Sequence, residues 1–112
     1  MTFESGDILL VPFPLSDFSG VKQRPVLVLS SRGYNGKVQD IIVCGITSNP
    51  HDRMFSVALS RTDVEEGEIP VDSRIKPDKL FTIHQQLIKK RLARVKKSIL
   101  NEVYGEIQKI FH

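Results

Sequence analysis

The sequence predicts a mainly β (α+β) fold, in which a small barrel or strongly bent sheet is closed by a C-terminal helix. Two observations carry this prediction. Short runs rich in Ile, Val and Leu, bounded by Gly, Pro, Asn, Asp and Ser, fill the first three quarters of the chain, and such runs are typical of the strands of small barrels. From about Ser98 the apolar residues instead recur every three or four positions, which is the period of an amphipathic helix.

Turn-forming residues separate the predicted strands. The clearest strands lie at Asp7–Val11, Pro25–Ser30, Ile41–Thr47 and Phe55–Leu59. The second can begin at Pro25 because a missing N–H is tolerated at the start of a strand. Shorter strands are predicted at Val71–Ile75, Leu80–Ile83 and Leu92–Val95. Loops are predicted where Gly, Ser, Asp and Asn accumulate, at Phe13–Gln23, Arg32–Asp40 and Asn49–Arg53.

The C-terminal segment predicts an amphipathic helix that closes the core. Its apolar face consists of Ile99, Leu100, Val103, Tyr104, Ile107, Ile110 and Phe111. Ser98 suits the N-cap of this helix because its hydroxyl can accept a hydrogen bond from the first turn.

Length and composition restrict the classes of function. We expect one domain, 1–112, since 112 residues with 40% hydrophobic and 26% charged side chains suit a single globular core. No run of 18 apolar residues and no basic start followed by an apolar core occurs, so we expect a cytoplasmic protein that makes no membrane contact. The single cysteine, Cys44, lies in an apolar run and is expected to be buried.

Positive charge is concentrated late in the chain. Between Arg74 and Lys97 there are nine Lys or Arg residues and one acid, a local net charge of +8 in a chain of net charge +3. Such a segment can attract a polyanion such as RNA. The alternative is a solvated surface, because Lys and Arg are exposed in most proteins. Charge alone leaves both interpretations open.

Several motifs follow one another along the chain. They are Gly6-Asp7-Ile8, Arg24-Pro25-Val26-Leu27-Val28, the strand Ile41–Ser48 that ends in two hydroxyls, the block Ser73–Ile83 and Arg91-Leu92-Ala93-Arg94-Val95. In these motifs the chain resembles the PemK/MazF-type toxins, small endoribonucleases of bacterial toxin–antitoxin systems. The resemblance implies a small SH3-like barrel of strongly bent antiparallel strands with a C-terminal amphipathic helix.

The same resemblance implies an activity and partners. We expect a metal-independent, sequence-selective endoribonuclease that cuts single-stranded RNA (mRNA) by attack of the RNA's own 2′-hydroxyl, without a cofactor. The scattered histidines and the single cysteine match no zinc-binding spacing. The expected partners are RNA, a cognate antitoxin and a second copy of the chain in a homodimer. A disordered acidic tail of the antitoxin would suit the +8 segment.

Attack by the 2′-hydroxyl needs a base, a donor to the charged phosphorane and an acid at the leaving 5′-oxygen. The resemblance gives Arg24 the task of stabilising the phosphorane, because its guanidinium can donate two parallel hydrogen bonds to phosphate oxygens. It gives Thr47 a role in holding the phosphate, with Ser48 beside it. From composition alone, Arg24 is a surface arginine, and Thr47 and Ser48 begin a turn.

The base is assigned through a different part of the family pattern. Many relatives carry a glutamate early in the first loop and some carry a histidine before the arginine, where this chain has Ser19 and Gln23. Other relatives use an R-x-D pair, which Lys76 and Asp78 match here. The resemblance therefore makes Asp78 the candidate base and Lys76 a charge stabiliser. His84 is the other candidate base, because imidazole titrates near neutral pH, and a solvated loop histidine is its alternative.

RNA contacts are predicted around these residues. The candidates are Lys22, Gln23, Ser48, Phe18 and Lys79. Phe18 lies in a polar loop, where an exposed ring can stack on a base. Two other functions remain open: a CcdB-like toxin that binds gyrase without catalysis, and a catalytically weak module that binds RNA or protein. The second is favoured by Ser19 and Gln23, which replace the ordinary acid–base residues.

Overall fold

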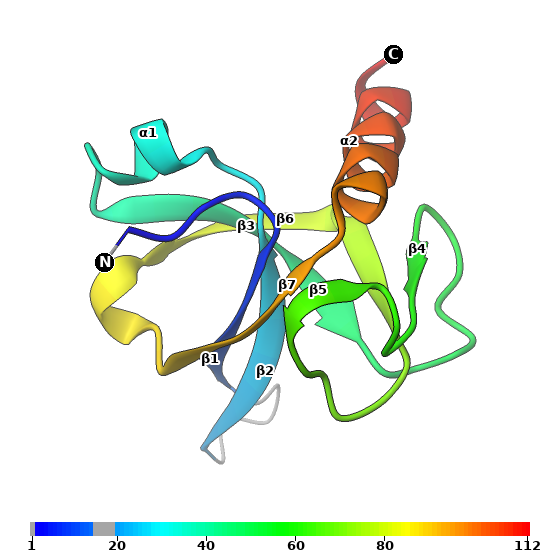
Figure 1. The fold of residues 1–112 in the computed structure, drawn as a ribbon, viewed down its shortest axis with the longest axis horizontal. Coiled ribbons are helices and arrows are strands. Elements are labelled where there is room, and N and C mark those ends of the chain that lie inside the picture. The colour runs from blue at the N-terminus through cyan, green and yellow to red at the C-terminus, as the bar shows by residue number, and fades with distance from the viewer. Residues whose placement is uncertain (1, 15–19) are drawn as a thin grey trace.

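The structure, a computed structural model, describes residues 2–14 and 20–112. Its strands are β1 (Asp7–Pro14), β2 (Val21–Val28), β3 (Asp40–Thr47), β4 (Val57–Leu59), β5 (Val64–Gly67), β6 (Ser73–His84) and β7 (Lys90–Val95). Its helices are α1 (Arg32–Asn35), the 3-10 helix η1 (Gln85–Leu87) and α2 (Lys97–Phe111). In the part of the chain described, the strands form one antiparallel sheet in the order β4-β6-β3-β2-β1-β7-β5. Figure 1 shows this sheet strongly curled, with α2 standing beside it, so the predicted fold class is confirmed.

Apolar side chains cover both faces of the central strands. One face packs against α2, and the buried residues there are Ile8, Leu27, Leu29, Cys44, Ile46, Val57, Leu59, Ile69, Ile75, Ala93, Val95, Ile99, Leu100 and Val103. The other face buries Leu9, Val11, Val26, Val28, Ile41, Val43 and Ile83. Because successive side chains of a strand point to opposite faces, burial on both sides requires the near-continuous apolar runs seen in the sequence. Each fully buried Ile, Leu or Val contributes about 1.5–3 kcal/mol, so the central strands form a rigid support.

The two short strands predicted between residues 71 and 83 are one strand, β6. Its pairing with β3 shifts between Cys44 and Gly45, where three extra residues, Pro77–Lys79, leave the ladder. A proline cannot donate a hydrogen bond to a neighbouring strand, so Pro77 suits such a bulge. The bulge therefore takes Asp78 and Lys79 out of the pairing with β3.

Other predicted boundaries also change. The hairpin of β1 and β2 extends to the pair Pro14–Val21, so much of the predicted loop Phe13–Gln23 is strand, and residues 15–19 lie outside the described residues. The predicted loop Arg32–Asp40 contains α1. Strand β5 was not predicted, because its sequence Val-Glu-Glu-Gly has one apolar residue and no clear alternation.

Helix α2 confirms the predicted C-terminal helix. Ile99, Leu100 and Val103 are its buried residues. The helix begins at Lys97, and Lys96 occupies the N-cap without a side-chain hydrogen bond, so the prediction that Ser98 caps the helix is wrong. Packing of the apolar face supplies most of the stability of such a helix. None of the helices described is long and apolar enough to cross a membrane.

A network of charges joins the strands β5, β7 and β1. Asp7, which is 2% exposed, accepts hydrogen bonds on Oδ1 from Nε of Arg91 at 3.1 Å and from Nε of Arg94 at 2.9 Å. Both guanidiniums also reach Glu66, at 2.8 and 2.7 Å, and Glu4 lies 3.2 Å from Arg94. A buried carboxylate needs such partners, because an unpaired buried charge costs several kcal/mol. The two arginines of the last motif therefore stabilise the edge of the sheet.

Candidate functional site

Arg24 and Thr47 lie near each other on neighbouring strands. The last pair of the β2–β3 ladder is Val26–Gly45, and Arg24 and Thr47 each lie two residues beyond it, so the antiparallel register brings them to the same edge. Both line a cavity of about 220 Å³ and a wider cavity of about 780 Å³. The structure thus brings together the two residues that the sequence analysis placed at the phosphate.

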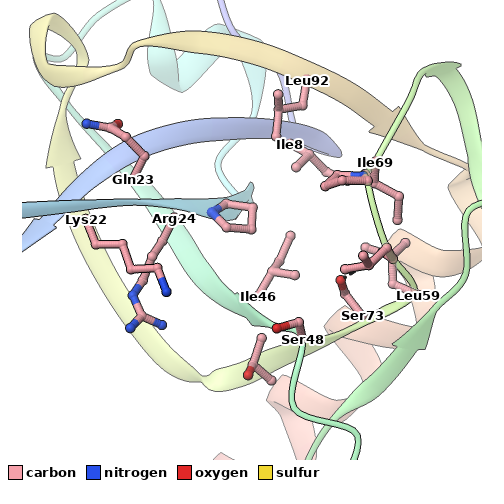
Figure 2. A pocket seen from close by; sticks show the side chains of 14 residues that line it. Ile8, Lys22, Gln23, Arg24, Ile46, Ser48, Leu59, Ile69, Ser73 and Leu92 are labelled. Atoms are coloured by element: carbon pink, nitrogen blue, oxygen red, sulfur yellow. Dashed lines mark hydrogen bonds between the residues drawn. The ribbon is translucent and has the colours of Figure 1, made fainter.

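The smaller cavity contains further predicted RNA contacts. Lys22, Gln23 and Ser48 line it together with Arg24 and Thr47. Figure 2 shows the side chains of Lys22 and Arg24 on the same side of β2 and that of Gln23 on the other, as the alternation of a strand requires. Lys22 and Arg24 therefore present two positive charges to the same region, next to the hydroxyls at the end of β3.

The wider cavity combines a positive charge with aromatic surface. Phe13 on β1 and Phe81 on β6 line it with Arg24, Thr47 and Lys79. The ring centroids of Phe13 and Phe81 are 5.1 Å apart, and the ring planes are inclined by 54°. Cations that bind phosphates, placed beside aromatic rings on which bases can stack, are the usual components of a single-strand binding groove.

Lys76, one of the residues that line this cavity, is buried in a cluster of oxygens. Its side chain is 5% exposed, and its Nζ lies 2.8 Å from Oδ1 of Asp52 and 3.6 Å from Oδ1 of Asp78. The same ammonium donates to the backbone carbonyl of Met54 at 2.6 Å. A buried ammonium requires this kind of pairing. Lys76 therefore holds the loop after β3 against the bulge of β6, and it also lines the wider cavity with Arg24 and Thr47.

Asp52 is a residue that the sequence analysis did not single out. It lines the wider cavity with Arg24 and Thr47, and its side chain is 39% exposed. The turn that carries it begins at Thr47, whose Oγ1 accepts a hydrogen bond from the N–H of Asn49 at 3.1 Å. The N–H of Asp52 then donates to the carbonyl of Asn49 at 3.3 Å. The Asn49-Pro50 pair predicted a turn, but only the fold shows that this turn brings a carboxylate back to Lys76.

His84 lies at the opposite end of β3. It pairs with Asp40, seven residues before Thr47 along that strand, which corresponds to about 23 Å of extended chain. Its Nε2 is 3.2 Å from Oε1 of Gln39, and its Nδ1 accepts a hydrogen bond from the N–H of Gln86. The structure therefore does not bring His84 together with Arg24. Phe18 and Ser19, the other predicted positions in the first loop, lie outside the described residues.

Cys44 is fully buried, as predicted. Burial raises the pKa of its thiol to about 12, and the negative charge of Asp78 contributes to the same effect. The thiol thus stays protonated at physiological pH, and a protonated thiol is a poor nucleophile.

The +8 segment between Arg74 and Lys97 does not form one continuous cationic surface. Lys76, Arg91 and Arg94 are paired with carboxylates from other parts of the chain, and Arg74 donates from Nε to the hydroxyl of Ser56 at 2.7 Å. Although partial burial alone would lower the pKa of Arg94, its hydrogen bond to Asp7 and the nearby acids raise it. Lys79, in contrast, is exposed and lines the wider cavity. Among the residues described, no three His, Cys, Asp or Glu side chains gather as a metal site would require.

Comparisons with known proteins agree with this fold. A family model described as the PemK-like, MazF-like toxin of type II toxin–antitoxin systems matches residues 4–111. A comparison with curated protein sequences gave no match. A MazE–MazF structure from Deinococcus radiodurans superposes with a TM-score of 0.81 at 23% identity, over 99% of this chain and 97% of that chain.

Two mycobacterial structures show the same fold at lower identity. An endoribonuclease in complex with its cognate antitoxin, from a mycobacterial species, has a TM-score of 0.79 at 15% identity, over 97% of this chain and 94% of that one. The toxin MazF-mt6 of Mycobacterium tuberculosis has a TM-score of 0.71 at 17% identity, over 92% and 95% of the two chains. At these identities, the likeness establishes the fold, while the roles of single residues rest on the site itself.

Proposed function

The chain belongs to the PemK-like, MazF-like toxin family of type II toxin–antitoxin systems, and from this premise we propose that it is a metal-independent endoribonuclease. Its substrate is single-stranded RNA, in the cell mRNA, which it cuts sequence-selectively. The observation that carries the proposal is that Arg24 and Thr47 line the same two cavities, one of which also contains Phe13 and Phe81. A cation and a hydroxyl can hold a phosphate there while the rings accept a base.

The proposed reaction is an internal transfer of the phosphate. The 2′-oxygen of the RNA loses its proton to a base and forms a bond to phosphorus, and the bond from phosphorus to the 5′-oxygen breaks. The products are a 2′,3′-cyclic phosphate and a 5′-hydroxyl. Arg24 donates to the phosphorane oxygens, whose negative charge increases in the transition state, and Thr47 holds the phosphate. This chemistry uses a nucleophile that the RNA itself supplies, so it requires no metal ion.

The proton of the 2′-hydroxyl passes to a carboxylate paired with Lys76. The family resemblance points to Asp78, which lies 3.6 Å from the Lys76 ammonium. Lys22, Gln23 and Ser48 contact the RNA from the smaller cavity and Lys79 from the wider one, and the role of Phe18 as a stacking ring is part of the same proposal. His84 is left out of the mechanism because it lies at the far end of β3.

The proposal includes a partner, a homodimer and a place of action. Two of the superposed structures are named as complexes, one as MazE–MazF and one as an endoribonuclease with its cognate antitoxin. We propose that this chain likewise binds a cognate antitoxin, that it forms a homodimer, and that it acts in the cytoplasm, where mRNA is found. An acidic segment of the antitoxin would compete with RNA for Lys22, Arg24 and Lys79, because both ligands are anionic.

One experiment separates this function from the CcdB-like and binding-only alternatives. The purified chain is incubated with a long single-stranded RNA in EDTA, and the cut ends are mapped. We expect cleavage at a short recurring sequence, with cyclic-phosphate ends, and no cleavage of DNA of the same sequence, because DNA lacks the 2′-hydroxyl. Intact RNA bound to a folded protein would support the binding module. Inhibition of gyrase without cleavage would support the CcdB-like alternative.

A further inference from the structure

The geometry points to Asp52 as the general base of this site and to Lys76 as the residue that positions it. The inference rests on the proposed ribonuclease function and deepens it, since it assigns the proton acceptor to a carboxylate that no sequence motif suggested. In this inference Asp78 balances the charge of Lys76, whereas the family resemblance makes Asp78 the base.

Access to the reacting atoms distinguishes the two carboxylates. Asp52 lines the wider cavity with Arg24 and Thr47. Among the described residues, it is the only carboxylate in the lining of the two cavities that Arg24 lines. Asp78 does not line them, although it is also paired with Lys76. A general base must come within hydrogen-bond reach of the proton that it removes, so access favours Asp52.

Asp52 is held in place at several points. Its Oδ1 lies 2.8 Å from Nζ of Lys76, and its backbone N–H donates to the carbonyl of Asn49. Two residues later, the carbonyl of Met54 accepts a hydrogen bond from the same ammonium. Lys76 itself is fixed by burial in β6, beside the bulge. A base built on a loop becomes precise when a rigid element clamps that loop, and Lys76 is this clamp.

The charge of the cluster suits a proton acceptor. Asp52 and Asp78 share the single positive charge of Lys76, so the three groups carry a net charge of −1. When one carboxylate takes a proton, the other still balances the buried ammonium, and no unpaired charge is left. The other charged groups around Asp52 are Arg24 and Lys79, which line the cavity, and its loop neighbours His51 and Arg53.

The step balances with groups already present. The O–H bond of the 2′-hydroxyl breaks, its proton passes to a carboxylate oxygen of Asp52, and the oxygen's electron pair forms the bond to phosphorus. The bond between phosphorus and the 5′-oxygen then breaks, and the leaving oxygen takes a proton from water. Asp52 later returns its proton to solvent, so the cluster regains its charge of −1.

The test compares Asp52→Asn with Asp78→Asn by the single-turnover cleavage rate on saturating RNA across pH. Asp52→Asn should lower the rate by about a hundredfold to ten-thousandfold with little change in RNA affinity. It should also abolish the fall in rate toward low pH, which reports protonation of the base. Asp78→Asn should keep that acidic limb. A purely structural loss in Asp52→Asn would slow the reaction at every pH and leave the shape of the profile unchanged, which would overturn the inference.

Two further measurements complete the test. Glu65→Gln removes an exposed carboxylate on β5 and should leave both rate and pH profile unchanged. With RNA whose leaving 5′-oxygen is replaced by sulfur, which departs without an acid, Asp52→Asn should remain slow; recovery of the rate would make Asp52 an acid and overturn its assignment as base.

If Asp78→Asn alone loses the acidic limb, Asp78 is the base and only this inference fails. If the wild-type chain cuts no RNA, the proposed function fails together with it.

Discussion

Glu66 accepts a hydrogen bond from Nη1 of Arg94 at 2.7 Å, across the paired strands β5 and β7. The hydrogen bond from Arg91 and, after it, the charge of Arg94 lower the pKa of Glu66 below its ordinary value of 4.5. A carboxylate whose pKa is lower in the folded chain adds stability above its unfolded pKa and loses it as pH falls. The edge strand β5 is therefore attached partly by a pairing that depends on pH.

We predict that Glu66→Gln lowers the free energy of unfolding at neutral pH and that its difference from the wild type shrinks as pH falls below about 4.5. The effect should be small and should weaken with salt, because the carboxylate is exposed. Urea denaturation at several pH values measures it. Glu65→Gln, on the same strand, is the control and should show no such dependence. A Glu66→Gln difference that stays constant down to pH 3 would contradict the prediction.

Strand β5 also illustrates why part of the fold could not be predicted. The central strands were predicted because near-continuous apolar runs are typical of strands that are buried on both faces. Strand β5 carries one apolar residue, Val64, and is held by pairing with β7 and by ion pairs to Arg91 and Arg94. Those partners are about 25 residues away in the chain, so no local pattern reveals them.

In the candidate site, too, some features could be predicted from the sequence and others could not. Arg24 and Thr47 were predicted because the strand motifs that contain them resemble those of the toxin family, and the register of β2 and β3 brings them together. The burial of Lys76 and the return of Asp52 to it depend on a bulge and a turn from separate segments. A charged residue in a sequence is ordinarily assigned to the surface, so a buried lysine is among the features that sequence patterns predict worst.

Gly67 is predicted to be essential for stability. Its φ is +74°, and a Cβ built there would clash with the backbone carbonyl oxygen of Leu92. We expect Gly67→Ala to destabilise the fold by at least about 2 kcal/mol, since it combines an unfavourable backbone conformation with a clash against backbone. Gly33→Ala is the matched control. It lies in α1 with nothing within 4 Å and should be neutral or stabilise by up to about 1 kcal/mol. Equal unfolding midpoints for the two variants would refute this account.

Lys79 is predicted to contact an RNA phosphate in the wider cavity. For single-stranded nucleic acid, each neutralised phosphate contributes about 0.7 to the slope of log affinity against log salt. Lys79→Ala should therefore weaken RNA binding and reduce the slope by about that amount. Lys37→Ala, an exposed lysine in the segment between α1 and β3, should leave the slope unchanged. Fluorescence anisotropy with a labelled RNA, from low to moderate salt, provides the slopes, and an unchanged slope for Lys79→Ala would remove Lys79 from the interface.

Arg24 is predicted to act on the rate of cleavage more than on RNA affinity, because its guanidinium meets charge that increases in the transition state. Arg24→Ala should lower the single-turnover rate at saturating RNA by about a hundredfold to a thousandfold. Arg24→Lys should recover only part of the loss, since an ammonium cannot donate two parallel hydrogen bonds to one phosphate. Arg32→Ala, an exposed arginine on α1, controls for the loss of a positive charge and should keep the wild-type rate. A folded Arg24→Ala protein that cuts RNA as fast as the wild type would disprove the phosphate-stabilising role.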